Sequence, residues 1–435
     1  MKMNLIRFGV LAMVATGTTF SLLAVPEISN VTQSRNDETH LVTISYDLSE
    51  TAIVTAQVFV NGEKLSPDAY GILAGKVHRT VAAGTGREIW WKAPAGLAAN
   101  AEVKLSAWAK DDPPDYMAID LITVNHRRFY ETAEDVPGGV TNRLYKTDKL
   151  LMRKIYAKDI QWPMGTSSDR LDGSQTYETN RSYWVQHAPH MVTLTENYYI
   201  SVYELTRRQY ANVIDRTFVR QENIIVNDVR PIPKSWSDTR GSNASYVWPV
   251  NGHSVPSTTP ISKFRKLTGL MLDLPTEAQW EYACRAGEAK NLYTGEALTD
   301  VAVDRVAWHY GNYANDPVGE EGKTHEVGLL EPNKWGLYDM LGNGAELCLD
   351  VMANGNGVNA DFYKGADAVD PQGPESGTST GNNGRHARRG SGVTNSLDRA
   401  KTSYIECRAD LRTSINWSAG YAENAIRLVV PATIP

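Results

Sequence analysis

Residues 333–350 read NKWGLYDMLGNGAELCLD, and this stretch decides how the second half of the chain is interpreted. It contains three glycines, two asparagines and three carboxylates, with apolar residues between them. Glycine at this density weakens both helices and strands. The stretch therefore predicts a turn-rich loop held against a core. Its carboxylates and backbone carbonyls are the oxygen ligands that a hard cation such as calcium prefers.

The chain as a whole has the composition of an ordinary soluble globular protein. Its 435 residues are 42% hydrophobic and 22% charged, with a net charge of −6, and the length predicts two or three domains. The longest basic clusters are HRR at 126–128 and RHARR at 385–389. Because a nucleic-acid groove needs a larger positive footprint, we expect no nucleic-acid partner.

The N-terminus has the features of a signal peptide over residues 1–24. Lys2 and Arg7 precede an apolar run from Phe8 to Ala24, and Ala24 is a plausible cleavage point, although Leu22 departs from the usual small residue. An uncleaved membrane anchor is the alternative, but several Thr and Ser residues weaken the run. We expect export to the periplasm or the extracellular space, with no stable membrane span after cleavage.

Residues 25–125 have the pattern of an all-β domain. Short runs alternate apolar and polar residues, and Asn61-Gly62 is a typical turn dipeptide. Short strands over about 100 residues favour a β-sandwich of the immunoglobulin or fibronectin type III kind. We expect it to act as a spacer or docking module. The apolar positions that carry the alternation are Val42, Ile44, Tyr46, Val103, Leu105 and Ala107.

A polar segment, residues 126–143, separates this domain from a second one predicted at 144–435. The segment contains Pro137-Gly138-Gly139, which favours a linker. Two helices are expected in the second domain because Thr206 with Gln209, and Thr276 with Gln279, have the spacing of capping boxes. We expect Gly287 to end the second helix.

Six blocks of the second domain, in order, carry a family resemblance. They are PMGTSS (163–168), HMVTLTENYYISVYELTRRQYANVI (190–214), LPTEAQWEYACRAG (274–287), residues 333–350, ARRGSG (387–392) and NAIRLVV (424–430). Together they resemble the sulfatase-modifying-factor family, whose founding activity is that of the formylglycine-generating enzyme. The resemblance implies an irregular α/β domain similar to C-type lectins.

The resemblance also implies a structural calcium site in the quoted stretch. Its ligands would be the side chains of Asp339 and Glu346 and the backbone carbonyls of Gly342 and Gly344. Calcium accepts such a mixed set of oxygens, and glycine lets the chain bend to present carbonyls. The alternative is that Asp339 and Glu346 accept hydrogen bonds from backbone groups nearby.

The copper chemistry of the founding enzyme requires two cysteines that follow an RGGS element, and this chain lacks them. Its matching element is Arg389-Gly390-Ser391-Gly392, and residues 393–404 contain no cysteine. Thiolates are the soft ligands that monovalent copper needs, so we expect no copper and assign no catalytic or cofactor-binding residue. The chain's cysteines are Cys284, Cys348 and Cys407, too few for a disulfide scaffold, although one pair remains open.

Further departures from the family surround the same site. Ala345 and Leu347 replace two tryptophans, whereas Arg389, Arg408, Arg412 and Arg427 persist, and we expect these arginines in partly buried ion pairs. The H-x-x-x-H-x-E ligand set of the family's non-haem iron branch is absent. For His187 and His190, surface positions on a loop are favoured over a metal site. For Ser391, a tight turn is favoured over a nucleophile.

Two hypotheses from different classes follow. The first is an exported, non-catalytic recognition or scaffold protein that binds an unknown peptide, glycan or protein and holds structural calcium. The alternative is a divergent formylglycine-generating-type or non-haem metal oxidase acting on a peptide or thiol. Convergence of His309, His325, His386 and Cys407 at metal-ligand distance would favour the alternative.

Overall fold

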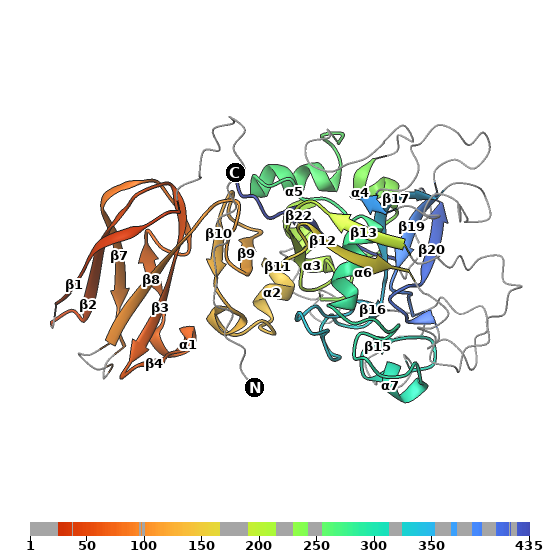
Figure 1. Ribbon diagram of the computed structural model, residues 1–435, viewed down its shortest axis with the longest axis horizontal. Coiled ribbons are helices and arrows are strands. Elements are labelled where there is room, and N and C mark those ends of the chain that lie inside the picture. Colours follow the sequence, from red (N-terminus) through yellow and green to blue (C-terminus); the bar gives the residue numbers. More distant parts are fainter. Residues whose placement is uncertain are drawn as a thin grey trace, which may run out of the picture.

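The computed structural model is mostly β with a few helices (Figure 1). It describes residues 25–36, 38–94, 97, 101–165, 190–214, 229–241, 255–312, 324–352, 367–371, 385–393, 406–416, 418 and 424–435. The predicted signal peptide at 1–24 lies outside these residues and stays a prediction. None of the helices in the described part is long and apolar enough to cross a membrane.

The N-terminal part consists of two β-sheets that share one hydrophobic cluster. One sheet has the order β1-β2-β7-β5; in the other, β3 pairs with β4, β6 and β8. The cluster draws on both sheets, including Val42 and Trp91 from the first and Val54 and Val58 from the second. The elements are β1 (Ile28–Asn36), β2 (Leu41–Leu48), β3 (Ala52–Val60), β4 (Glu63–Lys64), α1 (Pro67–Tyr70), β5 (Leu73–Gly75), β6 (Arg79–Val81), β7 (Gly84–Lys92) and β8 (Ala101–Trp108).

The sequence pattern explains these strands. In β2 every second residue is buried, and Val42, Ile44 and Tyr46 point into the cluster as predicted. The predicted Asn61-Gly62 turn joins β3 to β4, with φ of 53° and 84°. Both central residues therefore have the left-handed backbone that tight hairpins require.

A five-stranded sheet with the order β10-β9-β11-β14-β22 forms the centre of the molecule. Its elements are β9 (Tyr116–Asp120), β10 (Arg127–Tyr130), β11 (Lys149–Ile155), β14 (Tyr198–Ser201) and β22 (Val429–Pro431). The sheet thus joins segments from both sides of the boundary that the sequence predicts at residue 125. The last strand comes from the C-terminal end of the chain (Figure 1).

Short sheets and helices surround this centre. They are η1 (Ala133–Asp135), α2 (Leu144–Thr147), β12 (Ile160–Met164), β13 (His190–Leu194), α3 (Arg207–Ile214), α4 (Trp236–Arg240), α5 (Pro260–Thr268), α6 (Glu277–Arg285), α7 (Asp300–Asp304), β15 (Ala307–Trp308), β16 (Leu341–Gly342), β17 (Ala345–Met352), β18 (Ala368–Val369), β19 (Arg385–Arg389), β20 (Arg412–Asn416) and β21 (Asn424–Ala425). The sheet β20-β19-β17-β21 carries the second half of the quoted stretch.

The two predicted helices begin where their capping boxes place them. Before α3, the Thr206 hydroxyl accepts the Gln209 N–H at 3.1 Å and the Gln209 side chain accepts the Thr206 N–H at 3.0 Å. Thr276 and Gln279 make the same reciprocal pair at the start of α6. The helix α6 ends at Arg285, and both Ala286 and the predicted Gly287 after it have positive φ, of 47° and 83°.

The quoted stretch is a loop only in its first half. Gly336, Asp339, Gly342 and Asn343 have positive φ, as expected for a turn-rich segment. A Cβ on Gly342 would lie 2.3 Å from the Trp308 carbonyl oxygen, so glycine is required there. From Ala345 onward the chain forms β17, contrary to the expectation of a loop, because pairing with β19 and β21 outweighs the local composition.

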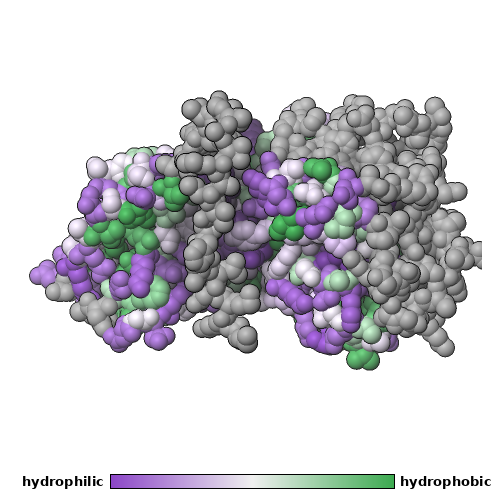
Figure 2. Space-filling model, in the orientation of Figure 1, coloured by the Kyte–Doolittle hydropathy of each residue, from purple (hydrophilic) through white to green (hydrophobic). Residues whose placement is uncertain are grey.

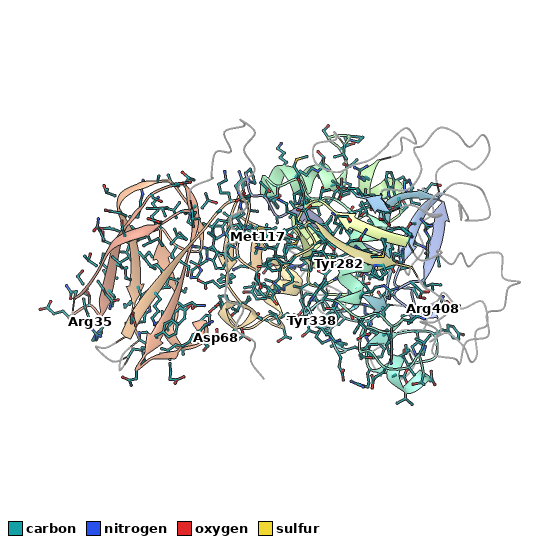
Figure 3. All side chains as sticks on the ribbon, in the orientation of Figure 1. Arg35, Asp68, Met117, Tyr282, Tyr338 and Arg408 are labelled. Carbon is teal, nitrogen blue, oxygen red and sulfur yellow. The ribbon has the colours of Figure 1, made fainter. Side chains whose placement is uncertain are left out.

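Ile53 connects the N-terminal sheets to the central sheet. It is fully buried, but unlike its neighbour Val54 it packs in a cluster with Met117 and Met152 of the central sheet (Figure 3 labels Met117). A hydrogen bond extends the junction, since Thr55 of β3 donates to Glu131, which follows β10, at 2.6 Å. The N-terminal sheets are therefore anchored by both apolar and polar contacts.

We predict that Ile53→Ala will lower the free energy of unfolding by about 2–5 kcal/mol, because it leaves a cavity in the junction cluster. Val54→Ala is the matched control on the opposite face of β3. Chemical denaturation followed by tryptophan fluorescence measures the loss. Limited proteolysis should release the N-terminal sheets as a fragment from Ile53→Ala but not from Val54→Ala; equal release from both would contradict the anchoring role.

Candidate functional site

An ion pair between Glu346 and Arg427 occupies the centre of the second half of the chain. Both side chains are fully buried. Arg427 Nε lies 2.9 Å and 2.8 Å from the two carboxylate oxygens, and Nη2 lies 2.6 Å from Oε1. The Trp280 indole donates to Oε2 at 2.7 Å. Both oxygens of the Glu346 carboxylate thus already accept hydrogen bonds from protein donors.

Arg427 also organises the backbone around it. Its Nη1 donates to the carbonyls of Ser201 and Val202 at 2.9 Å and 3.1 Å, and its Nη2 donates to the Tyr338 carbonyl at 2.7 Å. One guanidinium therefore joins the end of β14, the quoted loop and β17. Full pairing of a buried guanidinium is what makes its burial tolerable.

Glu204 is a third member of this site, and the sequence interpretation did not select it. It is fully buried, its Oε1 accepts the Gly344 N–H at 2.9 Å, and its Oε2 accepts from the Asn343 side chain at 2.7 Å. A buried glutamate just before the capped helix α3, within a resembling block, was the available clue. Sequence could not indicate that it meets a loop 140 residues away.

Asp339 lies in the same site, with its Oδ2 accepting the Gly328 N–H at 2.6 Å. Burial is the main reason that the pKa of Asp339 is raised to about 6, and the nearby Glu346 raises it further. Burial also raises the pKa of Glu204 well above its ordinary value, with repulsion from Asp339 and Glu346 adding to the effect. The three buried carboxyl groups of Glu204, Asp339 and Glu346 thus lie close enough to Arg427 for its positive charge to act on each of them.

The structure brings the predicted calcium ligands into one site but gives two of them other partners. Glu346 is held by Arg427 and Trp280, so as a ligand it would have to be shared with a cation already in place. Asp339 accepts the Gly328 N–H, so it too has a protein partner. The calcium assignment stays a prediction, since Glu204, Asp339 and Glu346 are not a group whose ligand atoms all lie within 4.8 Å of one another.

A second buried network joins α6 to β19 and β20. Arg389 donates to Glu277 at 2.8 Å and to Glu281 at 2.9 Å, and Arg412 also donates to Glu277 at 2.7 Å. Asp350 accepts the Glu277 N–H at 2.7 Å, and burial with the nearby Glu277 charge raises its pKa to about 7. The expectation of buried ion pairs for the arginines is confirmed.

The three cysteines are buried thiols in one apolar cluster and form no disulfide in this structure. Burial raises the pKa of Cys284, Cys348 and Cys407. Because the thiolate rather than the thiol binds copper, these side chains are poor copper ligands at neutral pH. Ala345 and Leu347, which replace two family tryptophans, are buried as well.

The histidines do not assemble a metal site with Cys407. Among the described residues, the group whose ligand atoms lie within 4.8 Å of one another is Asp300, Asp304 and His309, without His325, His386 or Cys407. In that group the His309 Nε2 is 2.8 Å from Asp304, while Nδ1 accepts the Gly311 N–H at 3.1 Å. Nε2 therefore carries the proton, which a metal would have to displace.

Two smaller expectations have clear outcomes. His190 is buried at the start of β13, so its predicted surface position is wrong, because the strand packs against β12 and β18; His187 lies outside the described residues. Ser391 is buried and has a φ of 64°, which agrees with the tight turn predicted for it.

Comparison with known proteins identifies the family. The sequence of residues 161–413, more than half of the chain, matches the family described as the sulfatase-modifying factor enzyme 1-like domain. The protein therefore belongs to this family, as its sequence blocks indicated.

The chain is similar over shorter stretches to curated relatives. It is 37% identical over 111 residues to the formylglycine-generating enzyme of Thermomonospora curvata, covering 24% of this chain and 35% of that protein. It is 36% identical over 107 residues to that of Streptomyces coelicolor, covering 24% and 32%. The match thus spans about a third of each relative's length. A solved structure, Treponema denticola variable protein 1, aligns with a TM-score of 0.44 and 20% identity over 65% of this chain and 95% of that one.

We predict that Asp339→Asn will change how stability depends on pH. Since the folded pKa of Asp339, about 6, exceeds the ordinary value of 3.8, the wild type binds this proton more tightly when folded. The tighter proton binding adds on the order of 3 kcal/mol to the free energy of unfolding below about pH 4. This stabilisation is lost as the pH rises through 6. Asparagine does not ionise, so the variant should gain stability relative to wild type between pH 4 and 7.

Denaturant unfolding in chelator at pH 4, 5, 6 and 7 measures this difference. Asp300→Asn, at an exposed position, controls for the loss of one negative charge. Parallel pH profiles for wild type and Asp339→Asn would contradict the raised pKa.

Proposed function

We propose that this protein is an exported, non-catalytic member of its family that recognises a peptide, glycan or protein. The observation that supports this most directly is the state of the sulfur atoms. The segment after Arg389-Gly390-Ser391-Gly392 has no cysteine, and the three thiols that exist are buried and protonated in an apolar cluster. Copper chemistry of the founding kind requires two accessible thiolates.

The retained framework supports a binding role. The arginines that persist from the family pattern hold buried ion pairs, which support the loops of the domain from within. A scaffold of this kind positions loops for binding. The chain has 21 tyrosines and 11 tryptophans, residue types that favour contact surfaces.

The proposal includes the role of the N-terminal sheets as a spacer or docking module of the immunoglobulin or fibronectin type III kind. Two antiparallel sheets over one apolar cluster support this class. The lectin-like character of the second domain is likewise proposed from the family resemblance. A divergent oxidase remains the second candidate, but among the described residues no observation favours it over recognition.

A formylglycine assay tests the main proposal. The purified protein, loaded with Cu(I), is incubated with a C-x-P-x-R peptide, and the peptide is examined by mass spectrometry for conversion of cysteine to the aldehyde. We expect no conversion, because the two thiolates that bind copper are missing. The Thermomonospora curvata enzyme serves as the positive control. Conversion above the protein-free background would contradict the proposal.

Metal content distinguishes the second candidate. Stoichiometric copper or iron in the protein purified from its producing cells would favour an oxidase. Calcium alone, or no metal, agrees with a recognition protein.

We also propose that calcium stabilises the Asp339 site structurally. Calcium bound to the folded state raises the melting temperature by mass action and keeps nearby carboxyl groups ionised. We expect 5 mM calcium to raise the melting temperature of the wild type, and Asp339→Ala with Glu346→Ala to abolish the rise. The single variant Glu346→Gln separates the roles of the two acids, since Glu346 already pairs with Arg427. Wild-type melting that is identical in calcium and in chelator would refute the site.

A further inference from the structure

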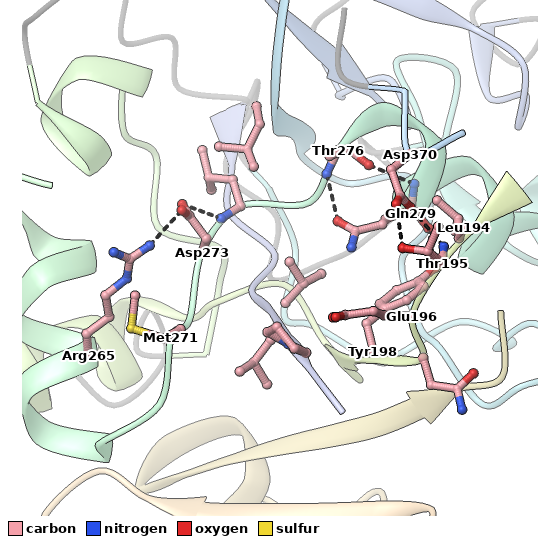
Figure 4. Close-up of a pocket in the computed structure, with 16 residues that line it drawn as sticks. Leu194, Thr195, Glu196, Tyr198, Arg265, Met271, Asp273, Thr276, Gln279 and Asp370 are labelled. Carbon is pink, nitrogen blue, oxygen red and sulfur yellow. Dashed lines mark hydrogen bonds and ion pairs between the residues drawn. The ribbon is translucent and has the colours of Figure 1, made fainter. Parts of the chain in front are cut away.

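A pocket of about 130 Å³ lies beside the edge of the central sheet, between β14, β22 and the start of α6 (Figure 4). None of Glu204, Asp339, Glu346 or Arg427 lines it. It is therefore distinct from the site described above.

The floor of the pocket is apolar and its rim is polar. Leu194, Leu274, Leu349 and Val430 line it and are each at least 95% buried. The side chain of Met271 lies at the rim and is 40% exposed. An apolar floor of this kind favours a ligand with a hydrocarbon portion.

The two ends of the pocket differ in charge. Figure 4 shows Arg265, Met271 and Asp273 at one end and Thr195, Glu196 and Asp370 at the other. At the first end Asp273 is paired with Arg265 and also with the buried Arg240, each at 2.8 Å. Two guanidinium groups on one carboxylate leave that end positive, so it disfavours a second cation.

The opposite end carries two carboxylates. Asp370 is fixed there, since its Oδ1 accepts the Thr195 N–H at 2.9 Å and its Oδ2 accepts the Thr195 hydroxyl at 2.5 Å. Each oxygen keeps a further lone pair for a ligand. Glu196 also lines this end, is exposed and makes an interaction of its own. A cationic group would therefore bind at this end.

Gln279 adds a directed hydrogen-bond donor between the ends. Its side-chain oxygen accepts the Thr276 N–H at 3.0 Å in the capping box, which turns the amide nitrogen toward the pocket (Figure 4). An amide N–H₂ group in this position suits a peptide carbonyl.

We propose that this pocket binds the basic side chain of an extended peptide. The aliphatic stem would lie on Leu349 and Val430, the cationic head between Glu196 and Asp370, and the main-chain carbonyl against the Gln279 amide. The inference goes beyond the proposed function. Peptide binding in this pocket does not depend on whether the protein has lost the copper-dependent activity of its family.

The test is a titration of the full-length, isotope-labelled protein with acetyl-Gly-Lys-Gly-amide, followed by NMR. The neutral analogue carries norleucine in place of lysine. We expect shifts of the Thr195, Glu196 and Gln279 amides, with affinity for the lysine peptide at least about fivefold higher, as one or two semi-exposed charge pairs would give.

Matched variants test whether the two carboxylates cause the preference for the lysine peptide over the norleucine peptide. Glu196→Gln with Asp370→Asn keeps one oxygen to accept the Thr195 N–H, while the new amide N–H₂ can donate to the Thr195 hydroxyl. This double variant should bring the two peptides to equal affinity. Glu63→Gln, an exposed carboxylate on β4, should leave the fivefold preference intact. Absence of shifts at 10 mM peptide, equal affinity in the wild type, or a preference that survives the double substitution would each overturn the inference.

Discussion

The buried pair of Glu346 and Arg427 is the interaction on which the second half of the molecule depends. Both groups have left water completely, and the guanidinium has exchanged its hydration for a carboxylate and three backbone carbonyls. Removing one partner of such a pair leaves an uncompensated charge in the interior, which costs about 3–5 kcal/mol. The pair joins β14, β17, α6 and the loop before β16, elements that lie far apart in the sequence. It makes the irregular region one rigid unit.

The same pair sets the chemistry around it. Arg427 neutralises Glu346, but Glu204 and Asp339 lie in the same field without a guanidinium of their own, so their pKa values rise. A site with more carboxyl groups than cations either keeps protons or binds a cation. Protonation of Asp339 and the calcium binding proposed for it would therefore compete.

Local patterns were sufficient to predict much of the architecture. The alternation in β2, the turn at Asn61-Gly62 and the two capping boxes each depend on residues within a few positions of one another, and all are present. The quoted stretch was predicted as a loop throughout, yet its second half is β17. Strand formation there depends on β19 and β21, which no local window contains.

The sequence by itself determined the family, the missing cysteine pair and the residues that start helices and turns, because these are matters of residue identity and short-range spacing. Only the tertiary structure decided that Glu204 joins Asp339 and Glu346, that Arg427 occupies the Glu346 carboxylate, and that Ile53 packs against the central sheet rather than its own. Those contacts join segments separated by up to some 140 residues. Burial and electrostatic competition, which act across such distances, are set only once the chain has folded.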